Sequence, residues 1–315
     1  MTTLAIGVVL GGTNLRAALI DTSSATPDLS GERKSSHESR EPEAIADAIA
    51  DAVRAIGVEG ADAPIGIGLA GMLRAGTGVV VNAPNLGWRD VDLGGLVEAR
   101  LPSHRVCLIN DVGAIALGEL RWGAGRGASD LMAVFVGTGI GGGIVVDGAP
   151  LSGGSGVAAE IGHVKVVTGP DARPCGCGAR GCLEAYAGGR MLGERVRAEI
   201  AAGASTLATE LAGKGPVHGG HLDQAARAGD PYALALWDEI APLFGLTLAN
   251  AVTLLNPERL ILGGAGWWGA PSLQDRVLAA YRALGNAPAV AACQVVSAEL
   301  GDNAGILGAG AFACR

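Results

Sequence analysis

One group of cysteine and histidine residues has the spacing of a metal site. His163 is followed by Cys175, Cys177 and Cys182 in a glycine-rich segment. Three thiolates and one imidazole form a closed tetrahedral set that suits Zn²⁺ and leaves no position for a catalytic water. The sequence therefore predicts a structural zinc ion. The alternative, buried or redox-active cysteines beside an unrelated histidine, needs a core that this loop does not offer.

A second candidate for chemistry is the carboxylate of Asp111, which follows a short apolar run and Asn110. A carboxylate at the end of a buried strand can accept the proton of a substrate hydroxyl during phosphoryl transfer. The plain alternative is a helix N-cap. Glu160 and Glu184 lie on either side of the cysteine cluster. Each is either a ligand for a sugar hydroxyl or a solvated acid.

Two glycine-rich turns have the composition of a phosphate site. Gly11–Asn14 and Gly137–Gly143 each lie between two apolar runs, one near the start of the chain and one near its middle. Backbone N–H groups without side chains around them, together with a threonine hydroxyl, can hold phosphate oxygens. Each turn alone is more often only a tight turn. The pair, one at the start of each half of the chain, favours a nucleotide site.

Other nucleotide and nucleic-acid sites are not predicted. The pattern GxGxxG occurs three times in a chain with 52 glycines, and the copy that begins at Gly137 leads into a strand instead of a helix. A dinucleotide site needs the helix, so this pattern is attributed to chance. No GxxxxGK[ST] sequence is present, and the formal charge of -8 includes no basic stripe for DNA or RNA.

The length and composition predict a globular protein of two α/β lobes. A chain of 315 residues exceeds the usual size of a single core. Its composition, with 49% hydrophobic and 17% charged residues, excludes a disordered protein. We expect a small lobe over residues 1–112 and a large lobe over 113–301 that carries the zinc loop, with the terminal helix 302–315 packing back on the first. A cytoplasmic location is expected, because neither a signal peptide nor a membrane span is indicated.

Alternating strands and helices give the order of the predicted elements. The two glycine turns should connect hairpins, and a strand that ends at Ile109 should lead through Asn110-Asp111 into a helix. The predicted strands are 3–9, 15–21, 64–69, 106–109, 131–136, 144–146 and 259–262, and the predicted helical segments are 43–56, 113–122, parts of 184–255, and 302–312.

With these residues assigned, the chain resembles the ROK family of sugar kinases and repressors over essentially its whole length. The resemblance is carried by Glu160-Ile-Gly-His163, the segment from Cys175 to Glu184, Ala83–Trp88, and Asn110-Asp111. It implies a two-lobed actin-like ATPase fold, also called ribonuclease H-like, with a cleft between the lobes. It also implies ATP-dependent phosphorylation of glucose to glucose 6-phosphate, with Asp111 as the general base, catalytic Mg²⁺ and structural Zn²⁺.

The resemblance also assigns roles to individual residues. The sugar would contact Asn85, Asn110, Asp111, Glu160, His163 and Glu184. One ring nitrogen of His163 would bind zinc and the other would face the sugar, so that the metal fixes the orientation of a sugar ligand. The ATP phosphates would bind Gly11, Gly12, Thr13, Asn14, Thr138, Gly139, Gly141 and Gly142, and the adenosine would lie against Gly263 and Gly264.

The sequence departs from the family pattern at Val9. The family usually reads Asp-x-Gly-Gly-Thr here, and the acid helps to hold the hydrated Mg²⁺, whereas valine cannot accept a hydrogen bond from a metal-bound water. This departure favours a competing hypothesis, a sugar-binding or regulatory protein with little catalysis.

Other competitors are kinases for N-acetylglucosamine, N-acetylmannosamine or mannose. Family regulators carry a helix-turn-helix before the first hairpin, which here begins at residue 3, so a kinase is expected. The resemblance further suggests a homodimer or homotetramer.

Overall fold

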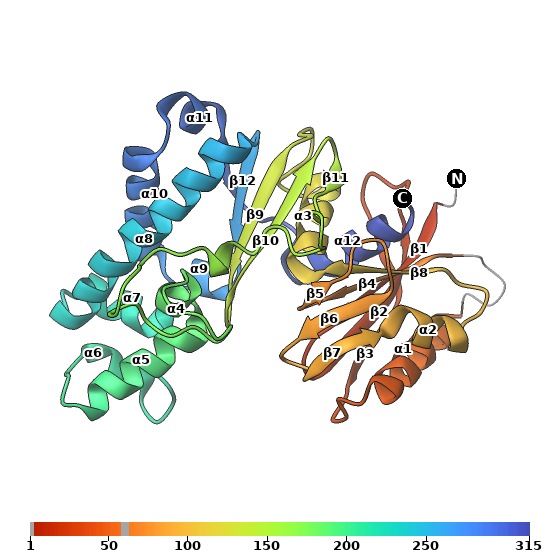
Figure 1. The fold of residues 1–315 in the computed structure, drawn as a ribbon, viewed down its shortest axis with the longest axis horizontal. Helices are drawn as coiled ribbons and strands as arrows, with labels where there is room; N and C mark the ends of the chain where they lie inside the picture. Colours follow the sequence, from red (N-terminus) through yellow and green to blue (C-terminus); the bar gives the residue numbers. More distant parts are fainter. Residues whose placement is uncertain (1–2, 58–62) are drawn as a thin grey trace. The chain divides into compact units, whose positions relative to one another are not determined.

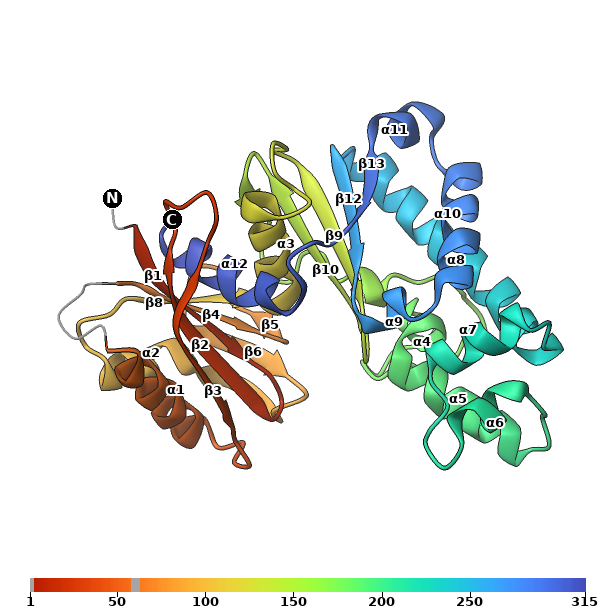
Figure 2. The same ribbon diagram turned by 180° about the vertical axis from the view of Figure 1, so that it is seen from behind.

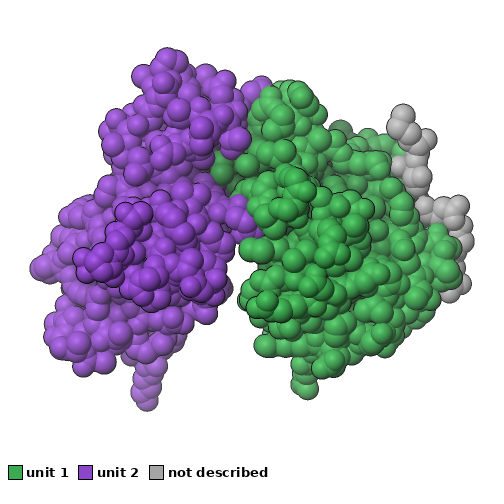
Figure 3. Space-filling model, in the orientation of Figure 1, with its two compact units in different colours: residues 1–133, 143–159, 297–315 green, residues 134–142, 160–296 purple. Residues whose placement is uncertain are grey.

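The computed structural model describes residues 3–57 and 63–315, which form two compact units (Figure 1, Figure 3). Unit 1 comprises residues 1–133, 143–159 and 297–315, and unit 2 comprises residues 134–142 and 160–296. The boundary between the lobes expected from the sequence is residue 112. The division by compactness instead keeps helix α3, Asp111–Trp122, together with unit 1.

Unit 1 contains a five-stranded sheet of order β3-β2-β1-β4-β8 and a three-stranded sheet of order β5-β6-β7. Strand β1 pairs antiparallel with β2 and parallel with β4, which pairs parallel with β8. The elements are β1 Leu4–Leu10, β2 Asn14–Asp21, β3 Leu29–Ser36, α1 Pro42–Ile56, β4 Ile65–Leu69, β5 Met72–Leu73, β6 Val79–Ala83, β7 Trp88–Asp92, α2 Leu93–Arg100, β8 Val106–Asn110, α3 Asp111–Trp122, β11 Ala149–Pro150 and α12 Ala304–Ala313.

The alternation of side chains along β1 and β4 assigns the two faces of the first sheet. Ile6 and Val8 on β1, with Ile65 and Ile67 on β4, belong to one buried cluster that also contains the apolar face of α1. Neighbouring residues in a strand point to opposite faces, so the glycines between these residues face the other side. Figure 1 and Figure 2 show α1 and α2 on one face of this sheet and α3 and α12 on the other.

Close approach of α12 to the sheet depends on those glycines. A Cβ added at Gly7 would collide with the carbonyl oxygen of Ile306, and one added at Gly66 would collide with that of Ala309. Helix α12 has the sequence AGILGAGAFA, and a Cβ added at its Gly310 would lie 3.5 Å from the backbone nitrogen of Gly7. Glycine is required at such positions because any side chain would push the helix away.

A second five-stranded sheet, of order β11-β10-β9-β12-β13, includes strands β9 and β10 at the division between the two units. Most helices of the second half belong to unit 2, where α8 packs against α10 (Figure 2). The elements are β9 Leu131–Val136, β10 Ile140–Val146, α4 Glu184–Ala187, α5 Gly189–Ala201, α6 Leu207–Ala212, α7 Gly219–Arg227, α8 Pro231–Leu255, β12 Arg259–Gly263, α9 Ala265–Trp268, α10 Pro271–Leu284, α11 Ala287–Ala292 and β13 Gln294–Ser297.

Helix α8 is the one helix among the described residues whose length and composition would allow it to cross a membrane. Its 25 residues include Pro242, and buried side chains such as Trp237, Phe244 and Leu248 lie along it. These contacts within unit 2 are those of a core helix.

Candidate active site

The carboxyl ends of three parallel strands place several predicted site residues at one edge of the unit 1 sheet. The register pairs Leu10 of β1 with Leu69 of β4, and Leu69 with Asn110 of β8. Neighbouring strands lie about 4.8 Å apart, so the ends of β1 and β8 are separated by roughly 10 Å. The first hairpin, Gly11–Asn14, and Asp111 leave the sheet from this same edge.

Asn110 and Asp111 form the start of α3. The side-chain oxygen of Asn110 accepts hydrogen bonds from the N–H groups of Val112 at 3.0 Å and Gly113 at 3.2 Å, which makes Asn110 the N-cap. Its amide nitrogen donates to the carbonyl of Gly71 at 3.3 Å. The Asn110 side chain, predicted to bind sugar, is therefore also used to cap the helix and to bind a loop.

The carboxyl of Asp111 is the first side chain of α3 and has a perturbed acidity. Oδ1 accepts from the N–H of Val112 at 2.9 Å. Burial raises the pKa of Asp111, and the hydrogen bonds from the backbone and from Asn110 offset this only in part. A carboxylate held less stably than in water is a stronger base, which is the property that proton transfer requires.

The first hairpin is held by residues of its own unit. The N–H of Gly11 donates to the carbonyl of Asn14 at 2.8 Å, and the N–H of His37 donates to the carbonyl of Thr13 at 2.9 Å. The His37 ring also reaches the hairpin, with Nε2 3.1 Å from the carbonyl oxygen of Gly11. Nδ1 lies at the same distance, 3.1 Å, from the carbonyl oxygen of Ser39. A carbonyl can only accept, so a neutral ring donates to one of these two carbonyls at a time.

Asn85, a predicted sugar ligand, lies beside the first hairpin. It is exposed in the turn between β6 and β7, and a Cβ added at Gly12 would lie 3.8 Å from the Asn85 Cβ. A cavity of about 650 Å³ adjoins the same hairpin and is lined by residues that include Asn14, Arg16 and Asp302. Arg16 in this cavity is committed to Glu32, with Nη2 2.6 Å from Oε1.

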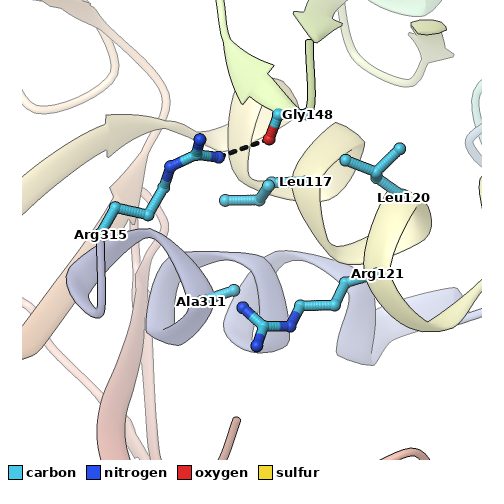
Figure 4. Close-up of a pocket in the computed structure, with 6 residues that line it drawn as sticks. All are labelled: Leu117, Leu120, Arg121, Gly148, Ala311 and Arg315. Atoms are coloured by element: carbon cyan, nitrogen blue, oxygen red, sulfur yellow. Dashed lines mark hydrogen bonds between the residues drawn. The ribbon is translucent and has the colours of Figure 1, made fainter. Parts of the chain in front are cut away.

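A separate cavity of about 610 Å³ in unit 1 is lined by none of the predicted site residues. Figure 4 shows it between α3 and α12, with the Arg315 guanidinium donating to the carbonyl of Gly148 at 2.5 Å. The side chain of Arg121 lies on the other side of Ala311 in this view, and its Nη2 donates to the carbonyl of Thr22 at 2.6 Å.

The second hairpin, residues 137–142, differs from the sequence expectation in its length. The turn was predicted to extend to Gly143, but β10 begins at Ile140, so Gly141 and Gly142 lie in the return strand. Glycine is intrinsically unfavourable in strands, but pairing within the sheet outweighs this here. The turn itself is closed by the N–H of Gly137, which donates to the carbonyl of Gly139 at 2.9 Å.

The carboxylate of Glu184 supports the second hairpin. Its Oε2 accepts from the N–H of Ile140 at 2.8 Å, and a Cβ added at Gly139 would collide with the same oxygen. Its Oε1 lies 4.0 Å from Sγ of Cys175 in the cysteine loop. Glu184, predicted to bind sugar, is thus also the link between the predicted phosphate turn and the predicted metal site.

Two further elements of unit 2 adjoin the second hairpin. At the start of α5, the N–H of Gly189 donates to the carbonyl of Gly137 at 3.1 Å, and the N–H of Arg190 donates to that of Thr138 at 2.8 Å. Gly264, predicted to lie against adenosine with Gly263 at the end of β12, has φ of +95°. A Cβ added at Gly264 would collide with the backbone of Val136, just before the turn.

The four predicted metal ligands converge in unit 2. The ligand atoms of His163, Cys175, Cys177 and Cys182 all lie within 4.8 Å of one another. Sγ of Cys177 is 3.7 Å from Sγ of Cys182, and Sγ of Cys175 is 3.8 Å from Nδ1 of His163. A tetrahedral zinc with bonds of about 2.0 to 2.3 Å separates its ligands by roughly 3.6 to 3.8 Å, so the residues fit a zinc ion.

The charges around the cysteines also suit a metal. Burial raises the pKa of Cys175 to about 12, so a metal must displace a proton from this thiol to bind. The Nζ of Lys165 donates to Sγ of Cys182 at 2.7 Å. Zinc with three thiolates and one imidazole carries a net negative charge, which the Lys165 ammonium would offset.

The second ring nitrogen of His163 points away from the cysteines. Nε2 lies 3.9 Å from Oε2 of Glu160, while Nδ1 faces Cys175. This arrangement allows the two uses predicted for His163, because one nitrogen can bind the metal while the other remains available to a ligand beside Glu160. The cysteine loop is further tied to α5 and α8, since Arg173 lies 3.5 Å from Glu199 and 3.8 Å from Glu239.

Comparison with known proteins identifies the family. The model described as ROK family matches residues 5–315. The chain belongs to the ROK family. A protein named glucokinase from Streptomyces coelicolor is 37% identical, covering 97% of this chain and 96% of that protein. A ROK family glucokinase from Streptomyces griseus, solved with glucose and AMPPNP, is 36% identical with a TM-score of 0.76, covering 99% of each chain. A ROK hexokinase from Thermus thermophilus is 31% identical with a TM-score of 0.81, and the match covers 99% of this chain and 98% of that chain.

These findings confirm the predicted family and the α/β actin-like fold of this ROK protein. The roles of its individual site residues stay predictions. Sequence reasoning missed His37, Lys165 and Arg190, which the structure places against the two hairpins and the cysteine loop. Lys165 could have been noticed as a cation two residues after His163, and Arg190 as a cation that follows a glycine pair.

Proposed function

We propose that this ROK protein is an ATP-dependent kinase that transfers a phosphoryl group to the 6-hydroxyl of glucose. Its similarity to proteins named glucokinase supports the reaction class and the sugar. The observation that carries the proposal is the strand register that sets Asp111 and the first hairpin at one edge of the unit 1 sheet. A base and a phosphate-binding turn are the two parts that phosphoryl transfer to a hydroxyl needs.

In this proposal Asp111 accepts the proton of the attacking hydroxyl. The other hydroxyls contact the remaining predicted sugar ligands, which are Asn85, Asn110, Glu160, His163 and Glu184. Both hairpins bind the ATP phosphates through backbone N–H groups, and Gly263 and Gly264 adjoin the adenosine. Precise orientation matters, because holding the reacting groups in place supplies much of the acceleration in such reactions.

The two metals have different roles in the proposal. Structural zinc would be held by His163 and the three cysteines, where it fixes the loop and the imidazole. The other metal, Mg²⁺ on ATP, offsets phosphate charge when bound. Position 9 offers it no acid, since Val9 lies against the first turn of α12, and a Cβ added at Gly305 would be 3.4 Å from Cγ2 of Val9.

The test is Asp111→Asn in a coupled assay of ADP release with glucose. We expect kcat to fall by about 10²- to 10⁴-fold, because an amide cannot accept the proton. Asp51→Asn, which changes an exposed acid on α1, is the matched control and should leave kcat unchanged. Circular dichroism and thermal melting confirm that both variants fold. Retained activity in a folded Asp111→Asn variant contradicts the assignment.

The dependence of kcat/KM on pH provides a second readout of the same carboxyl. The fold raises the pKa of Asp111, so the protonated, inactive form persists to a higher pH than for an ordinary aspartate. Activity should therefore rise with pH through an acid limb that lies above the ordinary aspartate pKa of about 3.9. The limb should be absent from the residual activity of Asp111→Asn.

Val9 supports a second candidate, a sugar-binding or regulatory protein with little catalysis. Calorimetry with glucose and with ATP, followed by a turnover assay with Mg²⁺, separates the two functions, because a sensor binds glucose and releases no ADP. A panel of glucose, mannose, N-acetylglucosamine and N-acetylmannosamine then identifies the preferred sugar.

We also propose that the enzyme is cytoplasmic, since the three clustered thiols require a reducing compartment to bind metal. We further propose that it assembles from two or four chains.

A further inference from the structure

The second hairpin lies beside a negative charge that a bound phosphate would meet. The carboxylate of Glu184 contacts both Gly139 and Ile140 of this turn, and it occupies the Ile140 N–H, which a phosphate oxygen would otherwise use. Phosphate oxygens a few ångströms from a carboxylate repel it strongly in a partly buried site. If the turn binds ATP, a cation close to it is required to offset this charge.

Arg190 is placed to supply that cation. It is the second residue of α5, and its own N–H donates to the carbonyl of Thr138 in the turn. Side chains in a helix tilt toward its N-terminus, so the arginine side chain is directed toward the N-terminal end of α5 and not along its body. Its guanidinium lies against Gly176 of the cysteine loop, where an added Cβ would collide with Nη2. The backbone of Arg190 thus contacts the turn, and its guanidinium lies against the cysteine loop.

The positive charge of Arg190 is not neutralised by a carboxylate in the part of the chain that the structure describes. No ion pair within 4.0 Å involves its guanidinium over residues 3–57 and 63–315, and its side chain is exposed. The neighbouring arginine on the same helix differs in this respect, since Arg195 binds Glu199 at 2.9 Å and Glu239 at 2.6 Å. The positive end of the α5 dipole adds to the charge at the position of Arg190.

We propose that Arg190 binds the terminal phosphate oxygens of the nucleoside triphosphate held at the second hairpin, an inference that rests on the proposed kinase function. A guanidinium presents a planar set of donors that matches two phosphate oxygens at once. The glycine at position 176 leaves the space that this side chain occupies. Arg190 thus offsets the Glu184 carboxylate and adds a directed contact that the backbone of the turn lacks.

The experiment measures the affinity of the full-length protein for ATP, AMP and adenosine by calorimetry in wild type, Arg190→Met and Arg190→Lys. We expect Arg190→Met to weaken ATP binding by about 10- to 100-fold, because a charge-assisted hydrogen bond is lost. Adenosine binding should stay within about twofold, since it has no phosphate to lose. Arg190→Lys should be intermediate, because lysine keeps the charge without the fork. Arg197→Met, an exposed arginine two turns further along α5, is the control and should bind ATP normally.

The outcomes separate this inference from the proposed function. Wild type that binds no ATP contradicts the kinase proposal and removes the basis of this one. Wild type that binds ATP, with Arg190→Met binding it equally well, overturns only the role of Arg190. Equal losses of ATP and adenosine in Arg190→Met also overturn it, because they indicate a disturbed turn and not a lost phosphate contact.

Discussion

The two glycine hairpins have similar sequences but are supported in different ways. The first hairpin is closed by its own backbone and by His37, which follows the adjacent sheet strand β3. The second hairpin depends on Glu184, on the start of α5 and, through Glu184, on the cysteine loop. A turn supported by its own sheet keeps its shape when distant groups change. A turn supported by a carboxylate next to a predicted metal site is expected to respond to metal binding there.

Removal of the metal should give the largest difference between the hairpins. Structural zinc stabilises small domains by about 10 kcal/mol or more, so its loss should release the loop around His163 and the three cysteines. Hydrogen exchange should then accelerate at residues 137–142 while residues 11–14 keep their protection. The measurement is exchange by mass spectrometry before and after chelation, with zinc content determined per chain. Equal responses in both hairpins would show that the metal does not act on the second one selectively.

Substitution of Glu184 breaks the same support one step nearer to the turn. Glu184→Ala removes the acceptor for the Ile140 N–H, a charge-assisted bond of about 1.5 to 3 kcal/mol. Exchange at residues 137–142 should rise by about 10- to 100-fold. Glu184→Gln keeps a side-chain oxygen at this position, so exchange at residues 137–142 should rise less in this variant. If alanine and glutamine behave alike, the hydrogen bond is not what holds the turn.

The corresponding change at the first hairpin is His37→Ala. It removes the ring contact to the Gly11 carbonyl but keeps the backbone bond to Thr13, so the loss should be about 0.5 to 1.5 kcal/mol. Exchange at residues 11–14 should rise by about 2- to 10-fold, with residues 137–142 unchanged. A larger effect here than for Glu184→Ala would reverse the comparison between the hairpins.

The smallest expected effect is a gain from Val9→Asp on the strand that leads into the first hairpin. An acid there would lie against the first turn of α12, where the helix dipole favours negative charge by about 0.3 to 1 kcal/mol. It would also restore an acceptor for metal-bound water, so the turnover number should rise several-fold. The assay is coupled ADP release with saturating glucose and ATP. An unchanged or lower rate would mean that the nucleotide metal is held by other groups.

Much of the fold follows from local patterns in the sequence. Strands β1, β2, β4, β8 and β9 were predicted to within one residue at each end, because apolar runs between glycine turns specify them. Strand β10 begins four residues before its predicted start at Ile144, because the glycines there belong to the strand. The sheet β5-β6-β7 was missed because its strands are short. In β7, Trp88–Asp92, most of the side chains are exposed and polar, as they are in a loop. The helical region 184–255 was not divided into its five helices because alanine-rich spacing continues across their ends.

The site was predictable to the extent that its chemistry is local. The predicted metal ligands lie close in sequence, and their residue types alone indicate zinc. The bond from Glu184 to Ile140 joins residues that are 44 positions apart, so only the folded chain shows it. From the sequence, a helix N-cap was the alternative role for Asp111, but in the structure Asn110 forms the cap. Which of the two neighbours caps the helix depends on where β8 ends.

The packing of α12 on Gly7 and Gly66 also affects how the chain folds during synthesis. The strands that these glycines belong to leave the ribosome early, but the helix that covers them follows roughly 200 residues after β8. At about 5 to 20 residues per second, the part of this face that α12 covers stays bare for about 10 to 40 s, while α3 is made directly after β8. Ile20 of β2 lies on this face beside Gly7 and belongs to the buried cluster that Ile306 and Leu307 of α12 complete, so the nascent chain has apolar surface to protect until its last helix arrives.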